Sequence, residues 1–415
     1  MPSPATSLSS QRTAHPRRYI VLLVLILGVI TATGPLATDM YLPAFPTIAS
    51  DLNASGSQIQ LTLTAAMIGL ALGQLIIGPM SDAWGRRRPL IVGLAVFVVA
   101  SALCMFVPSA GVFIALRFVQ GLAGAAGAVI ARAVVRDHFD GDGITKFFSR
   151  LVLVSMLAPL LGPILGAQML KFGPWQLGFG FLTGVSAISL VLVYFLLPES
   201  LPPEKRRGMN LGTMASTVRG LVTDARFIGP ALTLALMFGG MFTYISTFSV
   251  VSQHQLGASA QEYSLIFAIN TIGLLAGNQL NGLLIGKVET GRRLVTGIGG
   301  ALVAVAVLGV LGVTGGGNLV WLTVFLFAMM FSLGLVYPNC QSLALASQPA
   351  AVAGTGSALL GTLQFTLGGS IPTLATWTAS GGVTLSSMVT VMVAAIIVAV
   401  PVFALFARRA STNPS

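Results

Sequence analysis

The sequence predicts an all-α membrane protein with twelve transmembrane helices, arranged as two six-helix halves. Of its 415 residues, 55% are hydrophobic and only 8% are charged, whereas soluble domains carry about 25% charged residues. Apolar segments of about 20 residues, the length that a helix needs to cross a bilayer, recur along the whole chain. Basic residues gather in alternate connections between these segments. These observations exclude a soluble protein and a disordered chain.

The predicted spans follow one another with short connections. The first could instead be a secretory signal peptide, because Arg17 and Arg18 precede it. Its apolar run exceeds the usual length of about 7–15 residues and has no convincing cleavage site, so we expect a retained span. The twelve predicted spans are residues 18–46, 56–82, 88–107, 110–135, 146–171, 175–197, 227–253, 261–286, 293–313, 318–345, 352–377 and 383–407.

The basic residues predict the orientation, because lysine and arginine accumulate in cytoplasmic connections. With both termini on one side, 20 of the 22 basic residues fall there, while Lys171 falls on the other side and Arg117 within a span. We expect a multi-pass protein of the bacterial inner membrane with cytoplasmic termini, and the net charge of +11 calls for no nucleic acid. The 20 residues are Arg12, Arg17, Arg18, Arg86, Arg87, Arg88, Arg132, Arg136, Lys146, Arg150, Lys205, Arg206, Arg207, Arg219, Arg226, Lys287, Arg292, Arg293, Arg408 and Arg409.

The domain organisation follows from the longest polar connection, which divides the spans six and six. Gly85-Arg86-Arg87 lies between the second and third spans, and Gly291-Arg292-Arg293 lies at the equivalent connection of the second half. This recurrence supports a duplicated plan, as in two-halved secondary transporters. The predicted parts are an N-terminal tail (1–17), a first half (18–197), a central loop (198–226), a second half (227–407) and a C-terminal tail (408–415).

Asp39 interrupts the first apolar span. A charge at membrane depth costs from a few kcal/mol to more than about 10 kcal/mol, so it normally faces a cavity or a partner and marks a pathway. We therefore predict that Asp39 binds and releases a proton while another solute crosses. The alternative is that Asp39 caps a helix at the outer rim of the membrane.

Arg117 is the second costly charge. It shares a helix face with Gln120, Gly121 and Gly124, because these positions follow a 3.6-residue period. Counting residues places Arg117 about 9 Å from the outer connection, at a depth similar to that of Asp39. A neighbouring arginine and burial act in opposite directions on the pKa of a carboxyl group, so this pair predicts a protonation switch. The alternative is that Arg117 snorkels outward.

Two further motifs contain glycine and proline. In the turn after the second span, Gly78 precedes Asp82, which closes the helix, and Gly85 allows the chain to reverse before Arg86. In the fifth span, prolines remove backbone donors and glycines let a neighbouring helix come close, which predicts a kinked, closely packed helix. The residues of this second motif are Pro159, Gly162, Pro163 and Gly166.

Polar, methionine and aromatic residues on other spans are candidates for a substrate cavity, although such stripes are more often plain helix packing. Apart from Glu262 and Arg293 at the margins of two spans, the spans of the second half contain no charged residue, so we expect coupling chemistry in the first half alone. The candidates are Thr31, Gln60, Thr64, Gln120, Met237, Met241, Tyr244, Asn270, Asn339 and Gln364.

No catalytic or cofactor site is expected. The three histidines lie far apart in or near connections, no cysteine and histidine residues have the spacing of a metal site, and no phosphate-binding glycine loop occurs. We therefore expect a protein that is not an enzyme, holds no cofactor or metal, and draws its energy from an ion gradient.

Across nearly all twelve spans the chain resembles the major facilitator superfamily, and more narrowly its bicyclomycin-resistance and chloramphenicol-efflux drug antiporters. The resemblance lies in residues 39–46, 78–87, 117–121 and 198–200. It implies the major facilitator fold and a conformational latch at Gly78, Asp82, Gly85 and Arg86. It further implies proton coupling through Arg117 and an antiporter helix that contains Pro159, Gly162, Pro163 and Gly166. Ala83, Ala158 and Ala167 depart from the family pattern, as does Thr31, where some multidrug members carry a second acid.

These features predict a proton-coupled exporter of lipophilic drugs that works by alternating access, as a functional monomer in contact with membrane lipid. Its partners would be a small-molecule substrate and a proton. Three alternatives share some of the same features: an exporter of a metabolite such as an amino acid or sugar, a proton-coupled nutrient symporter, and a scaffold or receptor that transports nothing. Only the last of these would not need Asp39.

Overall fold

The computed structural model describes residues 17–138, 142–206, 211–314, 318–349, 352–377 and 383–412, and these residues contain helices and no strand. Each predicted span corresponds to one helix of 17 residues or more. These helices are α1 (Arg17–Asp39), α3 (Gly56–Trp84), α4 (Arg87–Leu103), α5 (Ala110–His138), α6 (Asp142–Phe172), α7 (Gln176–Leu196), α9 (Ala225–Val250), α10 (Ala260–Leu284), α11 (Thr290–Thr314), α12 (Leu319–Ala346), α13 (Ala353–Ser370) and α15 (Leu385–Thr412).

Shorter elements join them. The helices α2 (Phe45–Asp51), α8 (Leu211–Thr223) and α14 (Leu374–Trp377) are accompanied by 3-10 turns at η1 (Leu42–Ala44), η2 (Cys104–Phe106), η3 (Pro203–Lys205) and η5 (Ile371–Thr373), and by a π-helical turn, η4 (Val251–Gln255). Within the described residues, nine helical segments are long and apolar enough to cross a membrane. The three long helices outside that set are α6, α10 and α13.

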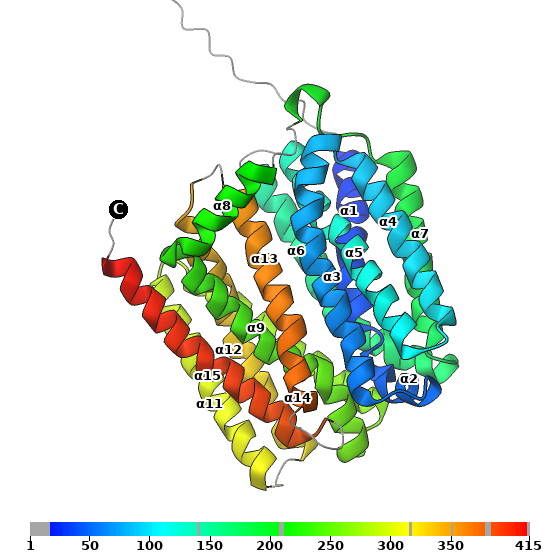
Figure 1. Ribbon diagram of the computed structural model, residues 1–415, viewed down its shortest axis with the longest axis vertical. Coiled ribbons are helices and arrows are strands. Elements are labelled where there is room, and N and C mark those ends of the chain that lie inside the picture. Colours follow the sequence, from blue (N-terminus) through cyan, green and yellow to red (C-terminus); the bar gives the residue numbers. More distant parts are fainter. Residues whose placement is uncertain are drawn as a thin grey trace, which may run out of the picture.

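The helices of the first half lie on one side of the bundle and those of the second half on the other (Figure 1). Direct bonds join the two groups. Thr362 of α13 donates to the carbonyl of Ala71 on α3 at 3.2 Å, and Ser264 of α10 donates to the carbonyl of Pro163 on α6 at 2.9 Å. These two contacts place α3 and α6 at the border of the first group.

Close glycine packing builds both groups. A Cβ atom at Gly121 of α5 would lie 2.0 Å from the Ala66 carbonyl oxygen of α3, and one at Gly277 of α10 would lie 1.9 Å from the Phe331 carbonyl oxygen of α12. Only glycine permits such an approach, and in lipid small residues are what allow helix backbones to pack tightly. The sequence therefore uses the same device in each half.

The helix starts also correspond. Ser55 before α3 and Ser259 before α10 each form a capping box, with Gln58 and Glu262 respectively returning a bond to the backbone. A capping box satisfies two donors that a helix start otherwise leaves unpaired.

The first span differs from its predicted extent. We expected one span to residue 46, but α1 ends at Asp39 and the chain continues through η1 into α2. Pro43 and Pro46 explain the break, because proline lacks a backbone donor and disfavours the α conformation in the preceding residue. Asp39 is therefore the last residue of its helix rather than an interior one.

The two ends of the bundle differ in character. One end holds the turn at Arg86, the last turns of α5 and the helix α8, and we call it the basic end. The other end holds η1, α2 and α14 (Figure 1). At this opposite end the two groups of helices are bonded: Gln253 donates to the Pro43 carbonyl at 3.2 Å, Gln60 donates to the Pro372 carbonyl at 3.0 Å, and Ser249 donates to the Leu42 carbonyl.

Candidate functional site

Asp39 is buried between helices, with 6% of its surface exposed. The Thr38 hydroxyl donates to its Oδ1 at 3.1 Å. Its backbone lies against α6, because a Cβ atom at Gly162 would lie 3.2 Å from the Asp39 Cβ, and one at Gly166 would lie 1.7 Å from the Met40 carbonyl oxygen. The two glycines of α6 thus make room for the end of α1, and α1 can keep this position only while residue 166 has no side chain.

Arg117 of α5 is fully buried and lies near Asp39 without pairing with it. Its guanidinium donates to Oε1 of Gln120 and sits 4.3 Å from the centre of the Tyr41 ring, two residues beyond Asp39. The described residues contain no ion pair between Arg117 and Asp39, yet the two charges interact through space. Nε and Nη2 of Arg117 have no hydrogen-bond partner among the described residues.

A small cavity of about 20 Å³ lies beside this pair, lined by Thr38, Arg117 and Gln120 among others. That volume accommodates about one water molecule, and the lining offers the polar partners that a buried water needs. Desolvation and the guanidinium act in opposite directions on the charge of Asp39. A local change in hydration or distance therefore shifts the balance between the charged and neutral forms of Asp39.

The helix α6 connects Asp39 to the second half. On one side it packs against α1 through Gly162 and Gly166. On the other side its Pro163 carbonyl accepts from Ser264 at 2.9 Å and its Ala167 carbonyl accepts from Gln261 at 3.1 Å, both on α10. The two prolines that the sequence placed inside this helix, Pro159 and Pro163, lie inside it. The helix α6 thus links the end of α1 to α10.

Most of the predicted cavity residues are buried in helix packing. Gln60 donates to the Ser246 hydroxyl at 3.1 Å, Met241 accepts from Tyr337, and Asn270 donates to the Tyr244 hydroxyl at 2.9 Å. Thr31 bonds carbonyls of its own helix. Thr64, Gln120 and Met237 are also buried, and Gln364 is half-buried on α13.

Asn339 lies elsewhere, toward the basic end of α12. It donates to Oδ1 of Asn281 at 2.8 Å, and the same oxygen accepts from Nη1 of Arg293 at 2.8 Å. The structure thus does not bring Asn339 to Asp39. It places it in a polar cluster of the second half instead.

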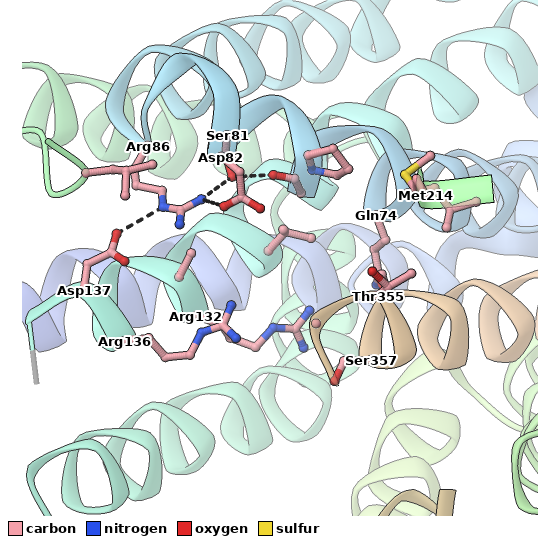
Figure 2. Close-up of a pocket in the computed structure, with 18 of the residues that line it drawn as sticks. Gln74, Ser81, Asp82, Arg86, Arg132, Arg136, Asp137, Met214, Thr355 and Ser357 are labelled. Carbon is pink, nitrogen blue, oxygen red and sulfur yellow. Dashed lines mark hydrogen bonds and ion pairs between the residues drawn. The ribbon is translucent and has the colours of Figure 1, made fainter. Parts of the chain in front are cut away.

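A cavity with a volume of about 640 Å³ opens at the basic end (Figure 2). It lies between α3 and α5 of the first half on one side, and α8 of the central loop and α13 of the second half on the other. Residues that line it include Gln74, Arg132, Arg136, Met214, Val218 and Thr355. At its inner limit, α13 meets α3, because a Cβ atom at Gly361 would lie 2.1 Å from Oε1 of Gln74.

The predicted latch residues form an ionic cluster on one wall of this cavity (Figure 2). Arg86 pairs with Asp82, donates from Nε to Asp137 at 3.0 Å and from Nη1 to Ser81 at 2.8 Å. Burial lowers the pKa of Arg86, whereas its bonds to Asp82 and Asp137 raise it, and the net shift is upward. These partners of Arg86 all lie in the first half, so a latch between the halves stays a prediction.

Gly85 is required at the same turn. Its φ is +91°, and a Cβ atom there would lie 2.4 Å from Oε2 of Glu199. The Glu199 carboxylate accepts from the backbone nitrogens of Arg86 at 2.8 Å and Arg87 at 3.2 Å. Sequence reasoning gave Glu199 no role in this turn, although the motif at residues 198–200 pointed to the segment.

Arg132 and Arg136 were expected on the cytoplasmic side, at the end of a span predicted to stop at residue 135, and the helix runs further than predicted. α5 continues to His138, so both residues belong to the helix, and both line the cavity. Arginine is a good helix former, so a helix can extend past its apolar run into a basic segment. Hydropathy alone cannot mark that extension.

The sequence profile of the Major Facilitator Superfamily matches residues 27–373. The chain belongs to the major facilitator superfamily. It is 39% identical over 348 residues to an uncharacterized MFS-type transporter of Bacillus subtilis, covering 83% of this chain and 86% of that one. It is 34% identical over 286 residues to a bicyclomycin resistance protein homolog of Haemophilus influenzae, covering 68% and 72%.

A solved structure shares this fold. The crystal structure of a D-xylose-proton symporter superposes with a TM-score of 0.70 at 17% sequence identity, covering 92% of this chain and 97% of the other. The predicted major facilitator fold and the resemblance seen in the motifs are confirmed by these comparisons. The protein is a multi-pass membrane transporter and not an enzyme.

Proposed function

We propose that this transporter exports lipophilic drugs, of the bicyclomycin or chloramphenicol kind, in exchange for protons. The observation that carries the proposal is the position of Asp39, a buried carboxyl at the end of α1, held against α6 and close to Arg117. Intramembrane acids of this kind serve as proton relays in transporters. The bicyclomycin resistance protein homolog among the relatives supports the choice of substrate class.

The proposed orientation places the basic end in the cytoplasm of a bacterial cell, because cytoplasmic connections are enriched in lysine and arginine. The cavity of about 640 Å³ then opens to the cytoplasm, and the bonds from Gln253, Gln60 and Ser249 close the periplasmic end. In this arrangement the structure represents the state that loads substrate from inside. Both termini are proposed to be cytoplasmic, and one chain with its two six-helix halves is proposed to suffice.

The cycle uses the link from Asp39 through α6 to α10. With Asp39 charged and near Arg117, the cytoplasm-facing state takes up the drug. The halves then rock, the periplasmic contacts break, and protonation of Asp39 from the periplasm favours release and return. Moving one charge through 100 mV is worth about 2.3 kcal/mol, and one pH unit is worth about 1.4 kcal/mol. One proton therefore supports a concentration ratio of about two to three decades for a neutral drug under those conditions.

The test is substrate-induced proton movement in inside-out vesicles. Adding drug to wild-type vesicles with an acidic lumen should release protons from the lumen. We expect Asp39→Asn and Arg117→Ala to reduce that release to background. Glu204→Gln, which removes an exposed acid in the central loop, should leave it unchanged.

Each other outcome has a definite meaning. If both variants retain full coupling, the assignment of Asp39 and Arg117 is wrong. A nutrient symporter would release no protons when substrate is added from the cytoplasmic face. An exporter of an amino acid or sugar would release protons with that solute but not with the drugs, which would overturn the proposed substrate class.

A further inference from the structure

Arg132 and Arg136 form a pair in the cytoplasm-facing cavity. They lie four residues apart on α5, so their side chains leave the same face of the helix one turn apart. Figure 2 shows both extending from α5 into the space between α5 and α13, away from the carboxylate of Asp82. Two like charges are therefore held side by side, facing the second half of the molecule.

Nothing in the described part of the chain neutralises them. The acids on the neighbouring wall, Asp82 and Asp137, are both bound to Arg86, and Asp137 also accepts from Ser200 at 2.8 Å. Neither Arg132 nor Arg136 forms a salt bridge or hydrogen bond within the described residues. Holding a guanidinium pair in this position has a cost, because like charges at this helical spacing repel each other.

The opposite wall of the cavity has a different chemistry. Met214 and Val218 of α8 present apolar side chains, and Leu201 adds a third, while Thr355 of α13 offers a hydroxyl. A guanidinium presents planar, paired donors that fit a carboxylate or phosphate, and the cavity volume of about 640 Å³ lies within the range of small-molecule sites. The cavity therefore pairs an anion-binding wall with an apolar one.

We propose that this cavity binds an amphipathic organic anion, with Arg132 and Arg136 holding its carboxylate or phosphate and α8 contacting its apolar part. The proposal rests on the proposed export function, since it names the substrates that load most readily from the cytoplasm. It assigns a specific role to these two arginines, which the other basic residues at the same end of the molecule do not share. Arg88 and Arg219 are exposed at the same end of the molecule but do not line the cavity.

The test uses two probes with one tail. Pyrenebutyrate carries a carboxylate, and pyrenebutyl-trimethylammonium carries a cationic group. Each is added to purified full-length protein in phosphatidylcholine nanodiscs, and binding is followed by energy transfer from tryptophan to pyrene. The signal from empty nanodiscs is subtracted. The variant is Arg132→Gln/Arg136→Gln. The matched control is Arg88→Gln/Arg219→Gln, which removes the same charge from the same end.

We expect the first variant to weaken pyrenebutyrate binding by at least about tenfold, the size expected for losing a charge-assisted bond. Cation binding should not weaken, and the control should bind both probes as the wild type does. Equal loss in variant and control would show a diffuse charge effect and overturn the proposal. Unchanged pyrenebutyrate binding in the variant would also overturn it.

A second arm separates the two sources of such an anion. Nanodiscs that contain phosphatidylglycerol should leave pyrenebutyrate binding intact if the ligand comes from solution, and should compete with it through Arg132 and Arg136 if a lipid headgroup occupies the cavity. Either result supports the anion site. Binding is measured without a gradient, so the two proposals can fail separately. If Arg132→Gln/Arg136→Gln leaves pyrenebutyrate binding unchanged while the wild type shows drug-induced proton release, only the anion site is overturned. If the variant loses pyrenebutyrate binding but the wild type shows no drug-induced proton release, only proton coupling is overturned.

Discussion

The turns that follow α3 and α10 occupy corresponding places in the two halves, yet they are stabilised differently. Arg86 and Arg293 are each 7% exposed. Arg86 is bound by the carboxylates of Asp82 and Asp137. Arg293 is bound by neutral groups, namely the Asn281 side chain at 2.8 Å, the Val288 carbonyl at 3.1 Å and the Thr290 hydroxyl at 3.0 Å.

The same contrast extends through the spans. The described helices of the first half bury Asp39 and Arg117, whereas the buried polar residues within the described spans of the second half are neutral, apart from Arg293 at its turn. Charged groups respond to protons, to salt and to voltage, and neutral amides and hydroxyls do not. Under the proposed exchange, the first half would hold the groups that sense the gradient, and the second half would provide the surface against which they move.

The largest effect is expected from a substitution that breaks the contact between α1 and α6. Gly166→Ala and Gly277→Ala each place a Cβ within 2 Å of a carbonyl oxygen, at 1.7 and 1.9 Å respectively. Both should lower the free energy of unfolding by about 1–3 kcal/mol, the usual cost of overpacking. Only Gly166→Ala should also reduce drug-induced proton release per folded molecule by at least tenfold, because its contact holds the chain beside Asp39.

The measurements are thermal unfolding in detergent and proton release from vesicles. Gly184→Ala is the control, since a Cβ there meets nothing within 4 Å. Equal loss of coupling in Gly166→Ala and Gly277→Ala would mean that the two halves contribute alike.

The second prediction compares the two turns directly. Arg86→Gln leaves two carboxylates without their partner, and Arg293→Gln leaves an amide oxygen without its donor. We expect losses of about 1–3 kcal/mol for Arg86→Gln and about 1 kcal/mol for Arg293→Gln, with the first value reduced because half of the Asp82 side chain is in solvent. Chemical denaturation measures both.

Added salt sharpens this comparison. The loss caused by Arg86→Gln should shrink between low salt and about 1 M, where the screening length falls to about 3 Å. The loss caused by Arg293→Gln should stay constant. A salt-dependent Arg293→Gln would contradict the distinction between an ionic and a neutral turn.

The third prediction concerns the closed end opposite the basic end, which is periplasmic in the proposed orientation. Gln253→Ala removes the bond to the Pro43 carbonyl between the halves. A net hydrogen bond is worth about 1 kcal/mol, so the equilibrium should shift about fivefold toward the state that is open to the periplasm. The measurement is the rate at which a thiol reagent labels a cysteine introduced at Thr64, and an unchanged rate would show that this bond does not hold the end closed.

The smallest expected effect is that the stability difference between wild type and Arg86→Gln does not change with pH. The pKa of Arg86 is raised above its ordinary value. A raised pKa means that the stabilisation is complete below the ordinary value and is lost only as pH rises through the raised one, far above neutrality. The stability difference between wild type and Arg86→Gln should therefore be the same at pH 6.5 and pH 9. A difference that changed within that window would require another titrating group in the cluster.

The sequence predicted much of the fold, because the cost of polar groups in lipid makes each span visible as an apolar run. It also predicted that Asp39 and the α6 glycines matter, since a charge or a dense glycine pattern has few other uses in a membrane. It did not predict the side on which Asn339 lies, because the partner Arg293 comes from a different helix. Nor did it place Arg132 and Arg136 in a cavity, because the direction of α5 is set by the glycine contact of Gly121 with α3.

The two guanidiniums of α5 that have no partner among the described residues, Arg132 and Arg136, have a consequence for leakage. Closing the cytoplasmic mouth on an empty cavity would strip water from Arg132 and Arg136 with no negative charge to replace it, and burying unpaired charge is costly. An anion carried into the cavity removes that cost. Under the proposed exchange, the bound anion would complete the closed cytoplasmic end of the cavity. Arg132 and Arg136 would then both select the substrate and suppress cycles of the empty transporter, which would dissipate the proton gradient.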